Sequence, residues 1–343
     1  MKTRLLKSEE IKEAGRILRN GGLVGIPTET VYGLAANALS SEAVLKIFEA
    51  KGRPDDNPLI VHIANLDEID DLVAYVPPVV YDLAKAFWPG PLTIVLEKSD
   101  IIPNEVTAGL DTVAIRMPNH KVAQEIIREA GVPLAAPSAN TSGRPSPTTA
   151  QHVMEDMDGR IDAVIDGGPC SVGVESTVIT LCTRKPKLLR PGKITPEEIS
   201  KVLGTEIEID DAVFGEILDG EIPTSPGMKY KHYSPKANVI IVDADSDDFR
   251  NYVNLKAEKG KVAAIVFDEE SKGFNCDILF FGKEEDDLAH ANTLFSNLRK
   301  CDELGVDTVF VHCPSAEGIG FAVINRLLRA ADFEILSLGG DEL

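Results

Sequence analysis

The chain has 343 residues, 43% of them hydrophobic and 26% charged, so its composition is that of an ordinary globular protein with room for two domains. Its formal net charge of −20 opposes simple electrostatic capture of nucleic acid. The charge is uneven, because residues 1–200 carry a net −6 and residues 201–343 a net −14. A local basic cleft is therefore easier to build in the first part of the chain.

The five cysteines contain no C-x-x-C pair, so they indicate neither a zinc site nor a disulfide framework. A reducing compartment is expected. The first ten residues are too polar for a signal peptide, and no apolar run approaches the roughly 18 residues of a membrane span. We expect a cytoplasmic protein that does not associate with membranes.

Strands and helices follow one another irregularly in the first part of the chain. A helix is predicted between Ser8, its expected N-cap, and Gly21. A strand at 23–26 runs into residues 27–34, which are dense in hydroxyl groups, and the next helix ends at Gly52, a glycine suited to a left-handed cap. Further strands are predicted at 92–96, 112–117, 132–136, 163–165, 176–181 and 187–189, and helices at 66–74, 78–87, 120–130 and 195–204. This pattern predicts an α+β domain with a twisted mixed sheet.

Residues 51–63, KGRPDDNPLIVHI, join a cationic loop to an apolar strand. Two prolines stiffen the loop. Lys51 and Arg53 could be solvated charges near a helix C-terminus, or they could bind a polyanion. His62 could be a hydrogen-bonded core histidine or part of a site. The residues of this stretch leave both interpretations open.

Arg116 lies inside a predicted strand, so its guanidinium must either reach solvent or be paired with a carboxylate or ligand. Residues 137–147 form a second hydroxyl-rich, proline-stiffened loop past a strand end. Cations and hydroxyls that recur at strand ends support an anion or nucleotide pocket. Walker A, H-E-x-x-H and G-x-S-x-G motifs are absent, which argues against ordinary P-loop hydrolysis and metalloprotease chemistry.

The last third of the chain has a different pattern. Residues 205–236 are predicted to be a linker, acidic at first and then aromatic and basic in SPGMKYKHYSP. Strands and helices alternate regularly from residue 237, which predicts a smaller doubly wound, Rossmann-like α/β domain. Gly318 and Gly320 lack the third glycine of a dinucleotide fingerprint, so we interpret them as a helix entry. The predicted strands are 239–242, 262–267, 278–281, 308–311 and 334–336, and the helices are 247–258, 285–304 and 318–330.

Seven segments, in order, resemble the motif series of the YrdC domain. They are GGLVGIPTETVYGL at 21–34, KGRPDDNPLIVHI at 51–63, WPGPLTIV at 88–95, TVAIRM at 112–117, AAPSANTSGRPSP at 135–147, EST at 175–177 and RPG at 190–192. With SPGMKYKHYSP before a second α/β domain, the chain is similar to the long, two-domain threonylcarbamoyl-AMP synthases. The resemblance implies a YrdC-like catalytic domain at 1–204, a linker or lid at 205–236, and a Rossmann-like domain at 237–343.

The resemblance implies a nucleotidyltransferase that joins L-threonine, bicarbonate or CO2, and ATP into threonylcarbamoyl-AMP with release of pyrophosphate. Mg2+ would accompany ATP, and the resemblance implies no metal ligand of the protein. A downstream threonylcarbamoyl transferase would then pass the group to an adenosine of tRNA, so tRNA is an indirect target.

The resemblance also implies residue roles. The threonine contacts would be Thr30, His62, Arg116, Ala136 and Ser176. The ATP contacts would be Arg53, Asn57, Thr112, Ser138, Ser146, Arg190 and, from a lid at 221–235, Tyr230. Lys51 and Arg53 would act in catalysis by offsetting phosphate charge.

Two alternatives belong to other classes of protein. A YrdC-type domain could be a double-stranded RNA-binding module without catalysis, although the net charge opposes it. Carbamoyl transfer of the kind found in hydrogenase maturation proteins would require cysteine motifs and an acylphosphatase region, and neither is found in this sequence.

Overall fold

The computed structural model describes residues 2–215 and 233–338, which fall into two compact units. The first consists of residues 2–142 and 146–215, and the second of residues 143–145 and 233–338. Each unit has its own sheet and its own cluster of buried apolar side chains. They are therefore two domains, each with a core that its own residues build.

The first unit is built on one mixed sheet, which has eleven strands among the described residues. In spatial order the strands are β1 (Arg4–Lys7), β8 (Ala163–Asp166), β2 (Val24–Ile26), β3 (Gly33–Asn37), β7 (Leu134–Ala135), β4 (Ile60–His62), β6 (Thr112–Arg116), β5 (Leu92–Glu97), β9 (Thr177–Thr180), β10 (Lys187–Arg190) and β11 (Glu208–Ile209). Some neighbours are parallel, such as β4 and β6, and others antiparallel, such as β5 and β6. The predicted α+β fold with a mixed sheet is confirmed.

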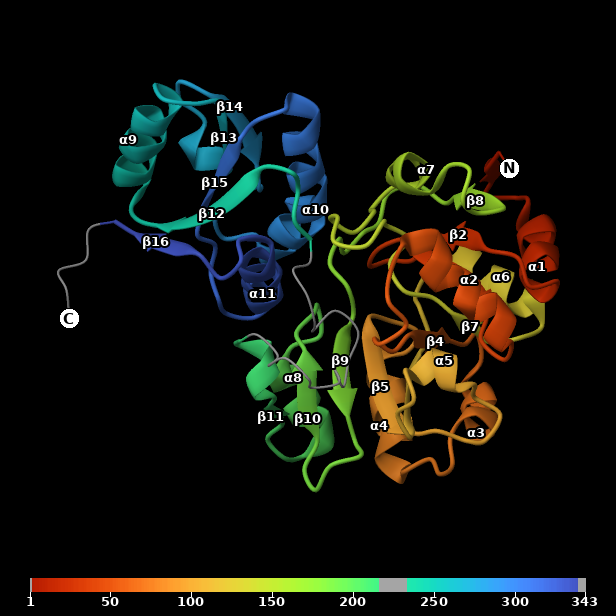
Figure 1. Ribbon diagram of the computed structural model, residues 1–343. Coiled ribbons are helices and arrows are strands. Elements are labelled where there is room, and N and C mark those ends of the chain that lie inside the picture. The colour runs from red at the N-terminus through yellow and green to blue at the C-terminus, as the bar shows by residue number, and fades with distance from the viewer. Residues whose placement is uncertain (1, 216–232, 339–343) are drawn as a thin grey trace. The chain divides into compact units, whose positions relative to one another are not determined.

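The helices of the first unit cover this sheet (Figure 1). They are α1 (Ile11–Arg19), α2 (Ser41–Lys51), α3 (Ile69–Leu72), α4 (Pro78–Phe87), α5 (Asn104–Thr107), α6 (Lys121–Ala130), α7 (Ala150–Met157) and α8 (Pro196–Leu203). Buried residues of α1 and α6 share one apolar cluster with β2 and β8. Gly15 permits the close approach of these two helices, because an added Cβ would stand 2.7 Å from Cβ of Glu129.

Local sequence signals explain where the helices near the site begin and end. The Ser40 hydroxyl accepts a hydrogen bond from the Ala43 amide and starts α2. Gly52 ends α2 in the left-handed conformation, at φ +62°, so Lys51 is the last helical residue, as predicted. The Thr195 and Glu198 side chains form a capping box at the start of α8.

The second unit contains a five-stranded sheet in which every pair of neighbouring strands is parallel. In spatial order the strands are β14 (Asp277–Phe280), β13 (Val262–Val266), β15 (Thr308–His312), β12 (Asn238–Asp243) and β16 (Ile335–Ser337). The helices are α9 (Ser246–Ala257), α10 (Asp287–Leu304) and α11 (Gly320–Ala330). The prediction of a smaller doubly wound α/β domain is confirmed, and Gly320 does begin a helix.

Some expectations about the elements were wrong. The first helix begins after Glu10, and Ser8 does not cap it. Strand β1 was not predicted, because four residues with one buried side chain show no clear alternation. Strand β3, GLAAN, was missed because its small residues have little strand propensity and only its pairing with β2 and β7 makes it a strand. Helix α5 was missed because it has only four residues, and α7 was missed because its eight residues directly follow a proline-rich loop.

The predicted linker starts too early. Strand β11 pairs in parallel with β10 and is followed by a 3-10 turn, η2 (Asp211–Val213). Two ion pairs hold this segment, Lys185 to Glu208 at 3.0 Å and Lys187 to Asp210 at 3.4 Å. Residues 205–215 therefore belong to the first domain, which does not end at residue 204. The remainder of the predicted lid up to residue 232 lies outside the described residues.

Candidate active site

The candidate site lies where several strand ends of the first unit meet. Strands β4 and β6 are parallel neighbours, and the register places His62 opposite Arg116, each at the last position of its strand. Strand β5 is antiparallel to β6, so its first residues lie beside the end of β6. Strand β9 is parallel to β5, so Ser176, just before β9, reaches the same edge. Three of the predicted threonine contacts are thus brought together by the order of the sheet.

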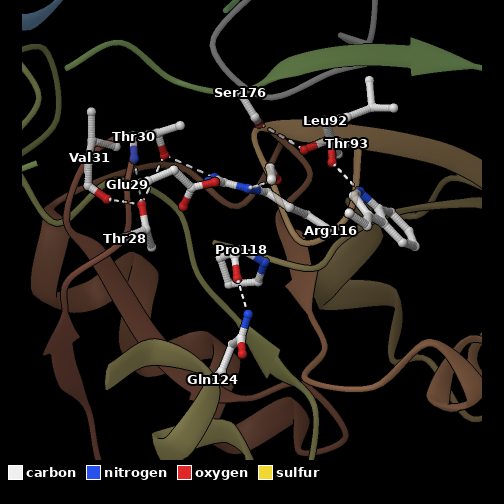
Figure 2. Close-up of polar contacts among 12 residues, drawn as sticks. Thr28, Glu29, Thr30, Val31, Leu92, Thr93, Arg116, Pro118, Gln124 and Ser176 are labelled. Carbon is white, nitrogen blue, oxygen red and sulfur yellow. Dashed lines mark hydrogen bonds and ion pairs between the residues drawn. The ribbon is translucent and has the colours of Figure 1, made fainter. Parts of the chain in front are cut away.

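Arg116 is buried, with 3% of the residue exposed, and each nitrogen of its guanidinium has a partner (Figure 2). Nη2 lies 2.7 Å from Oε1 of Glu29, Nη1 donates to the Thr30 hydroxyl at 3.0 Å, and Nε donates to the Gly90 carbonyl at 3.3 Å. Of the two alternatives that the sequence left open for Arg116, the structure shows pairing with a carboxylate.

Glu29 is 6% exposed, and burial by itself would disfavour its ionised form. The charge of Arg116 and its hydrogen bond to the carboxylate outweigh burial, and the backbone amides of Asn119 and Glu29 add to them, so the pKa of Glu29 lies below its usual value. The site therefore contains a buried carboxylate and a buried guanidinium that carry opposite charges at neutral pH.

Hydroxyl groups fix the loop between β2 and β3. The Thr28 hydroxyl lies 2.9 Å from that of Thr30 and donates to the Val31 carbonyl at 2.6 Å. The Thr30 amide in turn donates to the Thr28 hydroxyl at 3.2 Å. This local network holds Thr30 and Glu29 against Arg116, as Figure 2 shows.

His62 is buried and remains neutral. Burial, with the neighbouring charge of Arg116 acting in the same direction, lowers the pKa of His62 to about 3. Nδ1 lies 3.1 Å from the Ile60 carbonyl oxygen, and because a carbonyl only accepts, Nδ1 carries the proton. His62 therefore presents a neutral imidazole beside Arg116.

Ser176 connects two of the predicted subsites. Its hydroxyl lies 2.8 Å from the Thr93 hydroxyl and 3.2 Å from Nη2 of Arg190. Arg190 Nε also donates to the Ser176 carbonyl at 3.1 Å. A residue predicted to bind threonine and one predicted to bind ATP are thus in direct contact.

Lys51 is enclosed by the loop at 138–142. Its ammonium donates to the carbonyl oxygens of Ser138 and Asn140, the latter at 2.6 Å, while its own carbonyl accepts from the Ser142 amide at 3.1 Å. Burial, with a smaller contribution from Arg53, lowers the pKa of Lys51 well below its usual value. Lys51 thus anchors the loop from within.

Arg53 and Asn57 lie together in the stiff loop after α2. Arg53 Nη2 donates to the Asn57 carbonyl at 3.2 Å, and the guanidinium lies 6.0 Å from the centre of the Phe48 ring. Asn57 is 1% exposed. Ser146, further along, donates its hydroxyl to Oε1 of Glu175 at 2.6 Å, and both residues are buried.

Of the remaining predicted site residues, Thr112 lies apart from this cluster, whereas Ala136 touches it through the Ile60 carbonyl that His62 also faces. Thr112 begins β6 while Arg116 ends it, so the two are about 13 Å apart along an extended strand. Ala136 is buried in the apolar cluster, and its amide donates to the Ile60 carbonyl at 2.9 Å. Tyr230 lies outside the described residues.

Glu29 and Glu175 are site residues to which the sequence analysis gave no role. Each stands inside a quoted motif, and each is an acid flanked by residues of a buried segment, which is the signal that could have identified it. Thr93 was missed for a different reason, because a threonine within a strand is an ordinary sheet residue until its neighbour is known.

Two features are absent from the residues that the structure describes. No group of three or more His, Cys, Asp or Glu side chains there could hold a metal ion. None of the described helices combines the length and the apolar character needed to cross a membrane.

Known proteins with similar sequences and structures identify the family of this chain. A family model covering Sua5, YciO and YrdC proteins, described as telomere recombination, matches residues 16–192. A second model, described as threonylcarbamoyl-AMP synthase, C-terminal domain, matches residues 194–332. The chain belongs to the Sua5/YciO/YrdC family, as a member that also has the C-terminal domain.

The similar members of this family are threonylcarbamoyl-AMP synthases. That of Pyrococcus abyssi is 47% identical over 335 residues, which cover 96% of each chain. That of Bacillus subtilis is 44% identical over 330 residues, which cover 95% of this chain and 94% of the relative. The crystal structure of P. abyssi Sua5 complexed with L-threonine matches with a TM-score of 0.91 at 44% identity, covering 99% of this chain and all of that one.

Proposed function

We propose that this chain synthesises L-threonylcarbamoyl-AMP from L-threonine, bicarbonate or CO2, and ATP, with release of pyrophosphate. The observation that carries the proposal is the match to threonylcarbamoyl-AMP synthases over 96% of both chains. The cluster of Thr30, His62, Arg116 and Ser176 at one sheet edge supports it, because it offers a guanidinium, hydroxyls and a neutral imidazole to a small polar substrate.

Arg116 is the proposed partner of the threonine carboxylate, since a guanidinium suits a carboxylate in geometry and charge. Thr30, His62, Ala136 and Ser176 surround the amino acid. The amine adds to CO2 to give a carbamate, and a carbamate oxygen then attacks the α-phosphorus of ATP while pyrophosphate leaves. Such a step depends on alignment of the reactants and on stabilisation of the charge on the phosphates. The burial of Arg116 and His62 keeps water away from the carbamate, which is labile.

The proposed ATP contacts are Arg53, Asn57, Thr112, Ser138, Ser146, Arg190 and Tyr230. Arg53 and Arg190 offset the charge of the leaving pyrophosphate, and Lys51 contributes by holding the loop that carries Ser138. Mg2+ enters with ATP as part of the substrate. Thr112 lies at the opposite end of β6 from Arg116, so a ligand that contacts both ends of the site must be as long as ATP.

We further propose that a separate transferase passes the threonylcarbamoyl group to an adenosine of tRNA, and that the protein acts in the cytoplasm. All five cysteines are free thiols, which suits a reducing compartment. Binding of double-stranded RNA without catalysis is not favoured, because the relatives that match along nearly the whole chain are synthases.

The test is an assay of pyrophosphate release by the purified full chain with ATP, bicarbonate and each amino acid in turn. Release should depend on L-threonine and should be accompanied by threonylcarbamoyl-AMP, detected by mass spectrometry. Pyrophosphate release that is indifferent to threonine would contradict the proposal. Replacing Arg116 by Lys provides a matched check, because a lysine keeps the charge but loses the planar fork, and the KM for threonine should rise at least tenfold.

A further inference from the structure

The ion pair between Glu29 and Arg116 is unusual because it is buried within the site. Glu29 is 6% exposed and Arg116 3%, and the two charges stand 2.7 Å apart. Their sum is zero. The Arg116 guanidinium is therefore already neutralised before any substrate carboxylate arrives.

The carboxylate of Glu29 is not fully used by the protein. Oε1 lies 2.7 Å from Nη2 of Arg116 and the amides of Asn119 and Glu29 favour the charged form, but neither carboxylate oxygen completes a well-aligned hydrogen bond with a residue that the structure describes. The carboxylate nevertheless acts on its surroundings, because its charge opposes the effect of burial on the pKa of His120 and helps raise the pKa of Cys170. A buried carboxylate whose hydrogen bonds are incomplete is stabilised further by a positively charged ligand group.

The other side chains around the pair do not supply that charge. His62 opposite Arg116 is neutral, Thr28 and Thr30 are hydroxyls, and Ser176 and Thr93 form a hydroxyl pair. A lone carboxylate bound to Arg116 would leave the region with an uncompensated negative charge. An ammonium group on the same ligand would restore the balance.

We propose that Glu29 binds the α-ammonium group of the amino-acid substrate, so that Glu29 and Arg116 together select a zwitterion. The inference rests on the proposed function, since it assumes that an amino acid binds at Arg116. Two opposite charges side by side match the adjacent ammonium and carboxylate of an α-amino acid, which likewise sum to zero. Glu29 is therefore a specificity-determining residue for the α-amino group.

The reaction itself predicts which kinetic constant depends on Glu29. The ammonium releases one proton to solvent before its nitrogen attacks CO2 and a second as the N–C bond of the carbamate forms. The attraction to Glu29 therefore exists in the bound amino acid and is absent during attack on the α-phosphorus. An interaction made in the ground state but not in the later transition state affects substrate binding and does not accelerate that step. Loss of the Glu29 charge should raise the KM for threonine without lowering kcat.

The experiment uses the full chain with Glu29→Gln, which keeps the shape of the side chain and removes the charge. Calorimetry would measure the binding of L-threonine and of 3-hydroxybutyrate, which has the carboxylate and hydroxyl of threonine but no amine. Threonine should bind at least tenfold more weakly to the variant than to the wild type. 3-Hydroxybutyrate should bind more tightly to the variant, because Arg116 is then no longer neutralised. A purely structural role of Glu29 would weaken both ligands alike.

Glu175→Gln is the matched control, since Glu175 is also a buried acid but faces Ser146. It should change the KM for ATP and leave threonine affinity within threefold of the wild type.

Equal binding of threonine to the wild type and to Glu29→Gln would overturn the inference. If Glu29→Gln does not fold, the wild-type protein still tests the inference. Equal affinity of the wild type for threonine and for 3-hydroxybutyrate would also overturn the inference. If the wild type binds threonine selectively but releases no pyrophosphate with it, the proposed function fails while the assignment of Glu29 stands.

Discussion

Arg116 shows how one residue can be both buried and charged. Its guanidinium has three protein partners from two separate segments, residues 29–30 and Gly90, and the carboxylate of Glu29 balances its charge. Removing one member of a buried pair leaves the other charge uncompensated and typically costs about 3–5 kcal/mol. Burial, with a smaller contribution from the charge of Arg116, keeps His62 beside it neutral.

His62 makes the stability of the first domain dependent on pH. Its pKa is about 3 in the folded chain against about 6.5 in the unfolded one, so acid protonates the unfolded state first and favours unfolding. Between pH 7.5 and pH 5 this residue should cost the wild type about 2 kcal/mol of unfolding free energy. His62→Gln should lose correspondingly less over the same interval.

The measurement is urea unfolding at several pH values, followed by the fluorescence of Trp88. The chain has a single tryptophan, and it is buried in the first domain, so its signal reports the unfolding of that domain. Lys121→Gln serves as a control on an 88% exposed side chain and should leave the pH dependence unchanged. Identical pH dependence in the wild type and His62→Gln would show that His62 is not the titrating group.

At the scale of elements, the site depends on how closely β9 and the end of β10 approach each other. Gly192, two residues after β10, lies against the start of β9. A Cβ at Gly192 would stand 2.3 Å from the amide nitrogen of Thr177 and 2.8 Å from the carbonyl carbon of Ser176. The backbone of Ser176 and Thr177 cannot accommodate a Cβ atom at these distances, so the start of β9 must shift.

Gly192→Ala should therefore displace Ser176 from Thr93 and Arg190. We expect a loss of about 1–3 kcal/mol in unfolding free energy, as for other overpacked sites. The KM for threonine should rise several-fold. Gly260→Ala is the matched control, because no atom lies within 4 Å of its added Cβ and its backbone is not left-handed. If Gly192→Ala kept the wild-type KM, the position of Ser176 would not matter for threonine.

At the scale of the whole molecule, the charge limits which partners can bind. The net charge is −20, and even the more balanced first 200 residues are negative overall. Phosphate polyanions are bound through Lys and Arg contacts that release counterions. Here the buried cations Lys51, Arg116 and Arg190 have partners within the protein.

Double-stranded RNA should accordingly bind weakly. In a filter-binding titration of the full chain between 50 and 200 mM salt, we expect no tight complex and no steep dependence of affinity on salt. The addition of threonine with ATP should not create one. Tight, strongly salt-dependent RNA binding would favour the RNA-binding module over the synthase.

The sequence by itself determined many of the helix and strand boundaries and the chemistry that these segments carry. The caps of α2 and α8, the left-handed Gly52 and the regular strand and helix alternation after residue 237 are local signals, and each was predictable because a few adjacent residues decide it. The motifs around Thr30, His62 and Arg116 likewise stand in short stretches whose order along the chain indicates the family.

Only the tertiary structure decided which of these residues meet. Glu29 and Arg116 lie 87 positions apart in the chain, as do Lys51 and Ser138, and the order of the strands brings each pair together. The burial that lowers the pKa of His62 and the β11 pairing that extends the first domain also depend on neighbours far away in the sequence. Such contacts depend on packing between segments, so no local pattern of residues could have predicted them.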